Sequence, residues 1–245
     1  MCTVTYIPLQ DGFLLTSSRD EKKYRPTIVP KYYRHTNSVL IYPRDEVAHG
    51  SWIAASQNKK IACLLNGAFN NHVKEDHYAI SRGQILLQIL DSKLFEIAFI
   101  KLKLSKVEPF TLLLIDYKRH LNITQLVWDG EHKHIRNICS TQASIWSSVT
   151  LYPEQVRELR QQWFHNWILA NCNVVDHNIY DFHTAKHSSI DSQNILMTGE
   201  NDLQTLSISQ IKISYYEQSL LYNDLINNVS TKLNLSELLC RQESL

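Results

Sequence analysis

Cys2 and the charged pair Arg19-Asp20 are the residues of this chain whose types and spacing best suit chemistry. Removal of Met1 would leave Cys2 with a thiol nucleophile and an α-amine base on one residue, as N-terminal-nucleophile hydrolysis requires. Arg19 and Asp20 come directly after a strand-like run. A guanidinium beside the thiol would lower its pKa, and the Asp20 carboxylate would hold the amine in place.

Asn66 is a further candidate, because it ends a neighbouring apolar run and its amide could donate to a tetrahedral oxyanion. Each of these residues also has a plain structural interpretation. Cys2 could be a small buried hydrophobe in an edge strand, and Arg19–Glu21 a solvated turn. Asn66-Gly67 is also typical of a hairpin turn. The spacing alone leaves both interpretations open.

Composition is that of an ordinary globular protein. The chain has 245 residues, 44% of them hydrophobic, which is enough for a sizeable core. The net charge of +1 does not indicate nucleic acid or an anionic membrane surface as a partner. We see no apolar signal-peptide core and no apolar run long enough to span a bilayer. The five scattered cysteines form no Cys-x-x-Cys motif, so we expect a cytoplasmic protein.

Strands and turns dominate the elements that must position these residues. Apolar runs around an Asp-Gly turn predict one hairpin, and a second hairpin follows around Gln57–Lys59. The polar segment of residues 18–38 contains two prolines and is predicted as loop. The predicted strands are Thr3–Ile7, Phe13–Ser17, Val39–Tyr42, Trp52–Ser56, Lys60–Leu65, Phe110–Ile115, Leu121–Trp128, Ile135–Cys139 and a late pair within Leu206–Tyr216.

Apolar residues at helical spacing predict helices over Ser81–Leu90 and Lys93–Leu104, and a third that Pro153 opens. The stripe of this third helix should face the core. No linker, repeat or low-complexity tract marks a boundary, so we expect one α+β domain over residues 1–245, with a peripheral polar tail after about residue 224. The apolar stripe of the third predicted helix consists of Val156, Leu159, Trp163 and Trp167.

Motifs for other chemistries are absent or incomplete. With six glycines, the chain has no phosphate-binding loop of the Gly-x-x-x-x-Gly-Lys or Gly-x-Gly-x-x-Gly type, and no Gly-x-Ser-x-Gly elbow. The histidine pairs His132/His134 and His183/His187 could bind a metal or haem iron. No third ligand lies at motif spacing, so we predict surface histidines and no metal site.

Several strings in this chain resemble, in the same order, the NRDE family, which is named for Asn-Arg-Asp-Glu. That family includes the eukaryotic transport and Golgi organisation protein 2. The resemblance covers about the first two-thirds of the chain. The strings that carry it are Met1-Cys2, Ser18–Glu21, Gly50–Ala54, Lys60–Asn66, Ser81–Gly83 and Ile138–Trp146.

The resemblance implies the fold of N-terminal-nucleophile hydrolases, a four-layer αββα sandwich of two stacked antiparallel sheets flanked by helices. It also implies a pocket around Cys2, formed by residues of the matching strings. The residues implied as catalytic are Cys2, Arg19, Asp20 and Asn66. Those implied as ligand-binding are Ser18, Glu21, Trp52 and Arg82.

Two departures from the family pattern affect activity more than fold. Ser18 stands where the motif has asparagine. Within residues 199–206 the family often has Gly-Thr-Arg-Ser, whereas this chain has no arginine there.

Members of the family are linked to haem trafficking, and acyl-CoA lipids are another ligand class proposed for them. We therefore expect the pocket to bind or traffic a small hydrophobic or cofactor-type ligand, haem or acyl-CoA-like, with no cofactor required. The alternative is a cysteine hydrolase acting on an amide or thioester, with Cys2 as its nucleophile.

Overall fold

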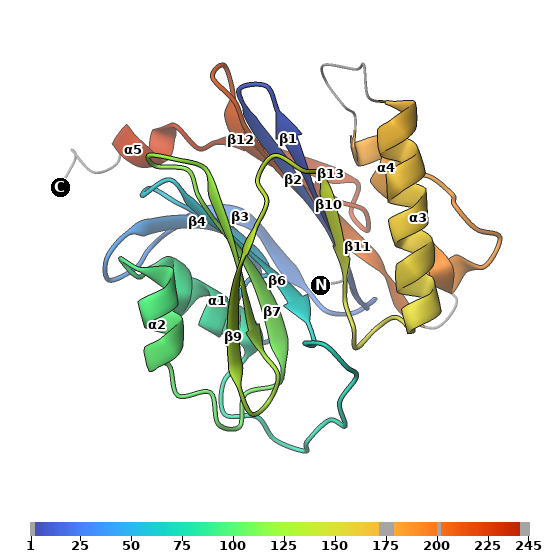
Figure 1. Ribbon diagram of the computed structural model, residues 1–245, viewed down its shortest axis with the longest axis horizontal. Helices are drawn as coiled ribbons and strands as arrows, with labels where there is room; N and C mark the ends of the chain where they lie inside the picture. Colours follow the sequence, from blue (N-terminus) through green and yellow to red (C-terminus); the bar gives the residue numbers. More distant parts are fainter. Residues whose placement is uncertain (1–2, 172–178, 200–201, 241–245) are drawn as a thin grey trace. The chain divides into compact units, whose positions relative to one another are not determined.

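The computed structural model describes residues 3–171, 179–199 and 202–240, and the chain divides into two compact units. The first unit combines residues 1–24 with residues 141–232, and the second combines residues 25–140 with residues 233–245. Figure 1 shows this in the colours, because blue strands near the N-terminus lie beside orange strands near the C-terminus. The six-stranded sheet of the first unit is thus assembled from segments distant in sequence.

That sheet is built around the β1–β2 hairpin, which the Asp11-Gly12 turn predicts correctly. Strand β2 pairs on its other side with β11, and β1 pairs with β10; all three of these pairings are antiparallel. The strands in spatial order are β10 (Ser144–Ser147), β1 (Thr3–Leu9), β2 (Gly12–Lys22), β11 (Leu203–Ile213), β12 (Gln218–Asp224) and β13 (Val229–Asn234).

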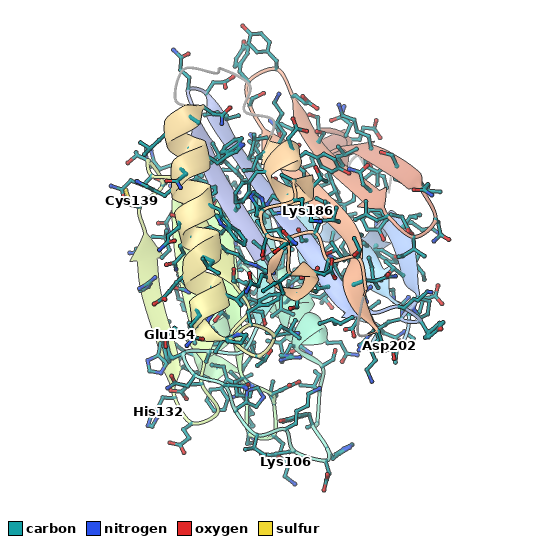
Figure 2. The ribbon with its side chains drawn as sticks, turned by 90° about the vertical axis from the view of Figure 1, so that its right-hand side faces the viewer. Lys106, His132, Cys139, Glu154, Lys186 and Asp202 are labelled. Atoms are coloured by element: carbon teal, nitrogen blue, oxygen red, sulfur yellow. The ribbon has the colours of Figure 1, made fainter. Side chains whose placement is uncertain are left out.

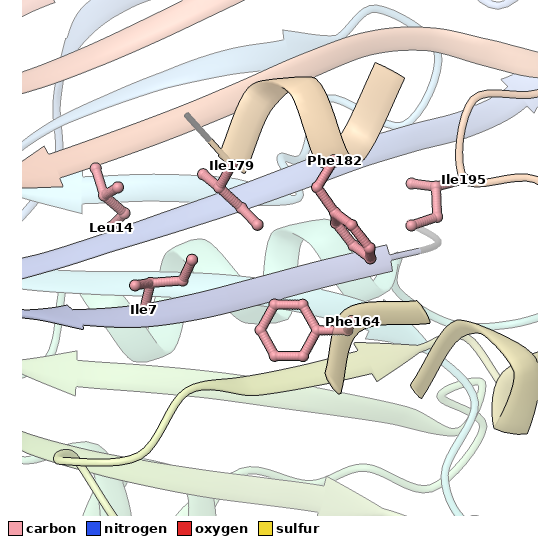
Figure 3. Packing of buried hydrophobic residues seen from close by; sticks show 6 residues of the cluster. All are labelled: Ile7, Leu14, Phe164, Ile179, Phe182 and Ile195. Atoms are coloured by element: carbon pink, nitrogen blue, oxygen red, sulfur yellow. The ribbon is translucent and has the colours of Figure 1, made fainter. Parts of the chain in front are cut away.

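Helices α3 (Glu154–Ala170) and α4 (Ile179–Thr184) cover one face of this sheet, followed by the 3-10 turn η1 (Asp191–Gln193). Figure 2 looks onto α3, with Glu154 labelled in its first turn. Side chains from β1, β2, α3, α4 and the segment after η1 form a buried apolar cluster (Figure 3). The cluster consists of Ile7, Leu14, Phe164, Ile179, Phe182 and Ile195.

The predicted stripe of α3 is only partly right. The residues of α3 that become buried are Arg160 and Phe164. Trp163 and Trp167 are partly buried and pack against the edge of the apolar cluster. The buried face of α3 therefore includes a charged residue.

The second unit is built on a seven-stranded antiparallel sheet in which each strand pairs with its neighbour in the chain. Its central strands β6 and β7 are mainly apolar and almost wholly buried, as expected of strands covered on both faces. Helix α1 (Arg82–Leu90) packs against β5 and β6, α2 (Phe95–Lys101) against β9, and α5 (Glu237–Cys240) against β4. The strands are β3 (Thr27–Arg34), β4 (Val39–Asp45), β5 (Ile53–Ser56), β6 (Lys60–Asn66), β7 (Phe110–Asp116), β8 (Asn122–Trp128) and β9 (Lys133–Ile138).

Helix α1 begins where Ser81 caps it, because the Ser81 side chain accepts a hydrogen bond from the backbone N–H of Gln84 at 3.3 Å. Its first turn lies directly against the segment that leads into β5. A Cβ on Gly83 would come within 2.8 Å of the backbone nitrogen and oxygen of Ser51. Glycine is required at this close approach of two backbones.

We expect the Gly83→Ala substitution to lower the free energy of unfolding by about 1–2 kcal/mol. The backbone collision costs about 1–3 kcal/mol, and the better helix propensity of alanine returns about 0.5–1 kcal/mol. Urea denaturation measures the change, with Gln88→Ala on the exposed side of the same helix as control. A Gly83→Ala protein as stable as the wild type would contradict the described packing of α1.

Two predictions about where strands lie are wrong. Residues 18–38 are not loop, because β2 continues to Lys22 and β3 follows from Thr27. Pro26 precedes β3, and Pro30 is accommodated within it because β3 is an edge strand with a register shift between Ile28 and Lys31. The region Leu206–Tyr216 is not a strand pair either. It lies mostly in one long strand, β11, whose partner β12 begins only at residue 218.

The remaining elements match with small changes of boundary. The second predicted helix is shorter than expected, since α2 ends at Lys101. The chain also continues beyond residue 224 into β13 and α5. In the described ranges, the structure contains no helix that is both long and apolar enough to cross a membrane.

Candidate functional site

Three consecutive predicted site residues, Ser18, Arg19 and Asp20, lie on β2 and are all buried, with 0%, 3% and 2% of their surfaces exposed. Successive side chains of a strand leave from opposite faces of the sheet. Ser18 and Asp20 therefore share one face, and Arg19 belongs to the other. Contacts with α4 and with the segment before α3 identify the Ser18 and Asp20 face as the one that the helices cover.

His183 of α4 joins the first two strands. Its Nε2 lies 2.8 Å from the Thr5 hydroxyl of β1, and its Nδ1 lies 2.7 Å from the Ser18 hydroxyl of β2. Full burial, together with the nearby charges of Arg160 and His187, lowers the pKa of His183 to about 3. The imidazole is therefore neutral at pH 7, with one ring nitrogen donating a hydrogen bond and the other accepting one.

Asp20 is held by two hydroxyl groups. Tyr152 donates to its Oδ2, and the Thr205 hydroxyl donates to its Oδ1 at 2.6 Å. Thr205 lies opposite Asp20 in the β2–β11 ladder, just before a register shift between Thr205 and Ser207. Both carboxylate oxygens thus accept hydrogen bonds on the helix-covered face.

Arg160 of α3 is fully buried and completes this polar layer. Its Nη1 donates to the Thr3 hydroxyl at 2.8 Å, its Nε to the Gln193 carbonyl at 3.0 Å, and its Nη2 to the Asn194 carbonyl. Its Cζ lies 3.6 Å from the centre of the Tyr152 ring, a cation–π contact. Through Arg160 and Tyr152, the start of β1 at Thr3 is connected to Asp20 on β2.

The opposite face of β2 presents Arg19 beside hydroxyl groups. Ser207 of β11 pairs with Arg19, and Ser209 pairs with Ser17. Paired residues of an antiparallel ladder project on the same side of the sheet. A buried positive charge therefore lies among three serines on this face.

Cys2 lies outside the described residues, so its predicted role stays a prediction. The described part of the β1–β2 ladder begins with the pair Thr3 and Ser18. Glu21, another predicted ligand-binding residue, is half-buried and pairs with Gln204 of β11. Its Oε1 accepts a hydrogen bond from the backbone N–H of Lys22 at 2.9 Å.

The other three predicted site residues, Trp52, Asn66 and Arg82, belong to the second unit and lie near one another there. Asn66 pairs with Phe110 at the end of the β6–β7 ladder. An Arg82 Nη donates to the Pro109 carbonyl at 3.4 Å, and the other lies 3.0 Å from the Glu108 carboxylate. The buried Trp52 precedes β5, and its carbonyl accepts from the Leu64 N–H at 2.8 Å.

The structure thus brings the predicted residues together in two groups. Ser18, Arg19, Asp20 and Glu21 form the group in the first unit, and Trp52, Asn66 and Arg82 form the group in the second. A role in catalysis or ligand binding for each stays a prediction.

Sequence reasoning missed His183, Arg160, Tyr152 and Thr205 as partners of this segment. The prediction that His183 is a surface residue is wrong, because it is fully buried. The four-residue spacing between His183 and His187 would place both on one face of a helix, but α4 ends at Thr184, before His187. No local signal identifies these partners, because each lies more than a hundred residues from its contact on β1 or β2.

The second histidine pair is as predicted at the surface. His132 and His134 are both exposed, and His134 Nε2 lies 2.7 Å from the Asp129 carboxylate. Hydrogen bonds from His134 and nearby backbone N–H groups outweigh a partial burial penalty and lower the Asp129 pKa to about 2. Across the described residues, no group of three or more His, Cys, Asp or Glu side chains is arranged to hold a metal ion.

Comparison with known proteins gives a family and a fold. The family model described as Transport and Golgi organisation 2 matches residues 1–220. No curated protein matches the sequence significantly.

Three solved structures are similar to this chain. A variant of conjugated bile acid hydrolase from Clostridium perfringens has a TM-score of 0.60 at 11% identity, covering 97% of this chain and 94% of its own. Penicillin V acylase from Agrobacterium tumefaciens has a TM-score of 0.58 at 11% identity, covering 97% and 87%. The Caenorhabditis elegans N-acylethanolamine-hydrolyzing acid amidase orthologue has a TM-score of 0.54 at 9% identity, covering 86% and 92%. At this identity the likeness shows the fold alone, and it confirms the expected α+β fold of the N-terminal-nucleophile-hydrolase type.

Proposed function

The chain belongs to the transport and Golgi organisation 2 family, and from that premise we propose that it binds a small hydrophobic or cofactor-type ligand, of the haem or acyl-CoA kind, and traffics it in the cytosol. The observation that carries the proposal is the buried Arg19, which lies on the face of β2 opposite helices α3 and α4. A guanidinium offers a planar fork of donors that suits carboxylates and phosphates. Haem carries carboxylates and acyl-CoA carries phosphates, so one group would recognise either cargo.

The division of Arg19 and Asp20 between two faces supports binding more than catalysis. A hydrolase built on these residues would need Arg19 beside the thiol and Asp20 beside the amine. Both oxygens of Asp20 already accept hydrogen bonds, from Tyr152 and Thr205. Thr205 also lies in the stretch where related sequences often have arginine. The carboxylate is thus engaged in holding the strand to its neighbours.

Titration with haemin and with oleoyl-CoA tests this proposal. We expect the wild type to bind at least one of the two saturably, and Arg19→Gln to weaken that binding about tenfold or more, because a charge-assisted hydrogen bond contributes about 1.5–3 kcal/mol. Haemin binding is followed by the Soret band, and oleoyl-CoA binding by calorimetry.

Lys22→Gln is the matched control, since it removes an exposed cation from the same strand. It should leave both affinities within about twofold of the wild type, because exposed charges contribute about 0–1 kcal/mol. Equal binding by wild type and Arg19→Gln, or no binding of either probe, would contradict the proposal.

The second candidate function is a cysteine hydrolase of amides or thioesters. It is favoured by the fold, because the three similar solved structures are named as a hydrolase, an acylase and an amidase. The sequence around the Thr3–Ser18 pair also favours it. Cys2 comes directly before Thr3 in the chain, and Arg19 comes directly after Ser18. A thiol near this guanidinium would have a lowered pKa and an increased thiolate fraction.

The mass of the intact protein before and after brief iodoacetamide treatment tests this candidate. The hydrolase predicts loss of Met1 and one fast adduct that maps to Cys2. The exposed Cys139 serves as the internal reference for an ordinary thiol, and the buried Cys63 for a protected one. Retained Met1, or a Cys2 no faster than Cys139, would exclude Cys2 as the nucleophile.

A further inference from the structure

Two successive cross-strand pairs on the face of the six-stranded sheet opposite α3 and α4 consist of polar residues. Ser17 of β2 pairs with Ser209 of β11, and the adjacent pair is Arg19 with Ser207. Neighbouring strands lie about 4.8 Å apart, and alternate residues of one strand about 6.6–6.8 Å apart. The four side chains therefore leave from the corners of a small rectangle, which we call the serine–arginine patch.

The three hydroxyl groups of this patch are buried and unsatisfied. Ser17, Ser207 and Ser209 each have 0% of their surface exposed. Their Oγ atoms have no hydrogen-bond partner in the part of the chain that the structure describes. Buried hydroxyl groups are nearly always hydrogen-bonded, and an unmet one is destabilising. Three such groups side by side indicate that their partner is not part of the described protein.

The surrounding residues show that the patch is a local departure from an apolar face. The next row along the same strands consists of Leu15 paired with Tyr6 and with Ile211, all of them buried. A sheet needing only a packed core would continue that row with apolar side chains. Instead, hydroxyl groups begin at Ser17, next to the one positive charge of the patch.

From these observations we infer that the serine–arginine patch binds an oxyanion, the carboxylate or phosphate group of a ligand. Three hydroxyl donors and a guanidinium match the several acceptor oxygens of such a group, and the positive charge selects an anion over a neutral amide or a cation. The nearest acidic residue in the adjoining strand, Asp224, pairs with Ser207, but its carboxylate accepts hydrogen bonds from the N–H groups of Ile226 and Asn227 in its own turn. The inference rests on the proposed function for the identity of the whole ligand and adds where its acidic group is held.

Thermal unfolding in sodium phosphate and in sodium acetate tests the patch, with sodium chloride of equal ionic strength as the reference. We expect at least one oxyanion to raise the wild-type Tm by about 3 °C or more when its concentration is about ten times its Kd. Ser209→Ala and Ser207→Ala should lose most of that shift. Without the oxyanion these two variants should be as stable as the wild type or more so, because each removes an unsatisfied buried hydroxyl group.

Ser219→Ala is the matched control, because the Ser219 hydroxyl lies in the same sheet but already donates to Glu217 at 2.8 Å. It should keep the full oxyanion-dependent shift. The inference would be overturned if the oxyanions do not raise the wild-type Tm, or if Ser207→Ala and Ser209→Ala show the same rise in Tm as the wild type. The hydroxyl groups would then be hydrogen-bonded to water.

A further variant separates this inference from the two candidate functions. Cys2→Ala should keep the oxyanion shift, since the patch does not use the thiol. An oxyanion shift without binding of haemin or oleoyl-CoA would overturn the proposed ligands and support the patch. Binding of either ligand that is insensitive to Ser207→Ala and Ser209→Ala would overturn the patch and leave the proposed ligands standing.

Discussion

Replacement of Arg160 by methionine is expected to lower the free energy of unfolding by about 3 kcal/mol or more. Arg160 is fully buried, and three of its nitrogen atoms donate to Thr3, Gln193 and Asn194. Methionine fills most of the volume but supplies no donor to these three oxygen atoms. It also removes the cation from the face of Tyr152, which lies 3.6 Å away. Urea denaturation followed by tryptophan fluorescence measures the loss.

Two further substitutions show that the loss comes from the hydrogen-bonding fork. Arg160→Lys keeps the charge but not the planar set of donors. Its free energy of unfolding should therefore lie between those of the wild type and Arg160→Met. Gln161→Met changes the next, exposed residue of the same helix and should leave stability within about 0.5 kcal/mol of the wild type. An Arg160→Met protein within 1 kcal/mol of the wild type, on the order expected for a surface position, would contradict the described role of Arg160.

The protein is also expected to lose stability in mild acid through His183. Burial lowers the pKa of His183 to about 3 in the folded state, against an ordinary value of 6.5. Below pH 6.5 the unfolded chain takes up a proton at this residue and the folded chain does not. The contribution of His183 to the free energy of unfolding is therefore fully present above pH 6.5. It falls by about 1.4 kcal/mol for each pH unit down towards pH 3.

The His183→Gln substitution should separate this titration from the hydrogen bonds. Glutamine retains a donor and an acceptor near Thr5 and Ser18 but does not titrate, so the variant should be less stable at pH 7 and less sensitive to acid. The difference in free energy of unfolding between the wild type and His183→Gln should be about 2 kcal/mol smaller at pH 5 than at pH 7. Urea denaturation at both pH values provides the comparison, with His165→Gln on the exposed side of α3 as control. Parallel acid slopes for wild type and His183→Gln would show that His183 is not buried in neutral form.

The sequence predicts the hairpins well because their signals are local. The Asp11-Gly12 turn lies between apolar runs, and the structure places β1 and β2 on either side of it. The central strands β6 and β7 are also predicted, since continuous apolar runs indicate strands buried on both faces. In these cases the residues that decide the structure are neighbours in the chain.

The extension of β2 beyond Ser17 could not be predicted in this way. Ser18, Arg19 and Asp20 are polar and by composition resemble a loop, yet all three are buried. They remain in the strand because His183, Tyr152 and Thr205 supply hydrogen bonds from distant parts of the chain. A polar run whose side chains alternate between two buried faces has no local pattern that distinguishes it from a solvated turn.

The candidate site shows the same limit. The ordered strings that resemble the family identify Arg19 and Asp20 as notable, but not that they serve different faces of β2. The serine–arginine patch depends on the register of β2 with β11, including the shift between Thr205 and Ser207. That register brings Ser207 and Ser209 beside Arg19, which no spacing along the chain reveals.

The measurement that tests the central claim most directly is the ligand titration repeated in Cys2→Ala and Arg19→Gln side by side. If the protein is a ligand-binding member of its family, Cys2→Ala binds haemin or oleoyl-CoA as tightly as the wild type, and Arg19→Gln binds about tenfold more weakly or worse. The account is contradicted if Cys2→Ala loses the ligand while Arg19→Gln keeps it. It is equally contradicted if the wild type releases free coenzyme A from oleoyl-CoA and Cys2→Ala does not.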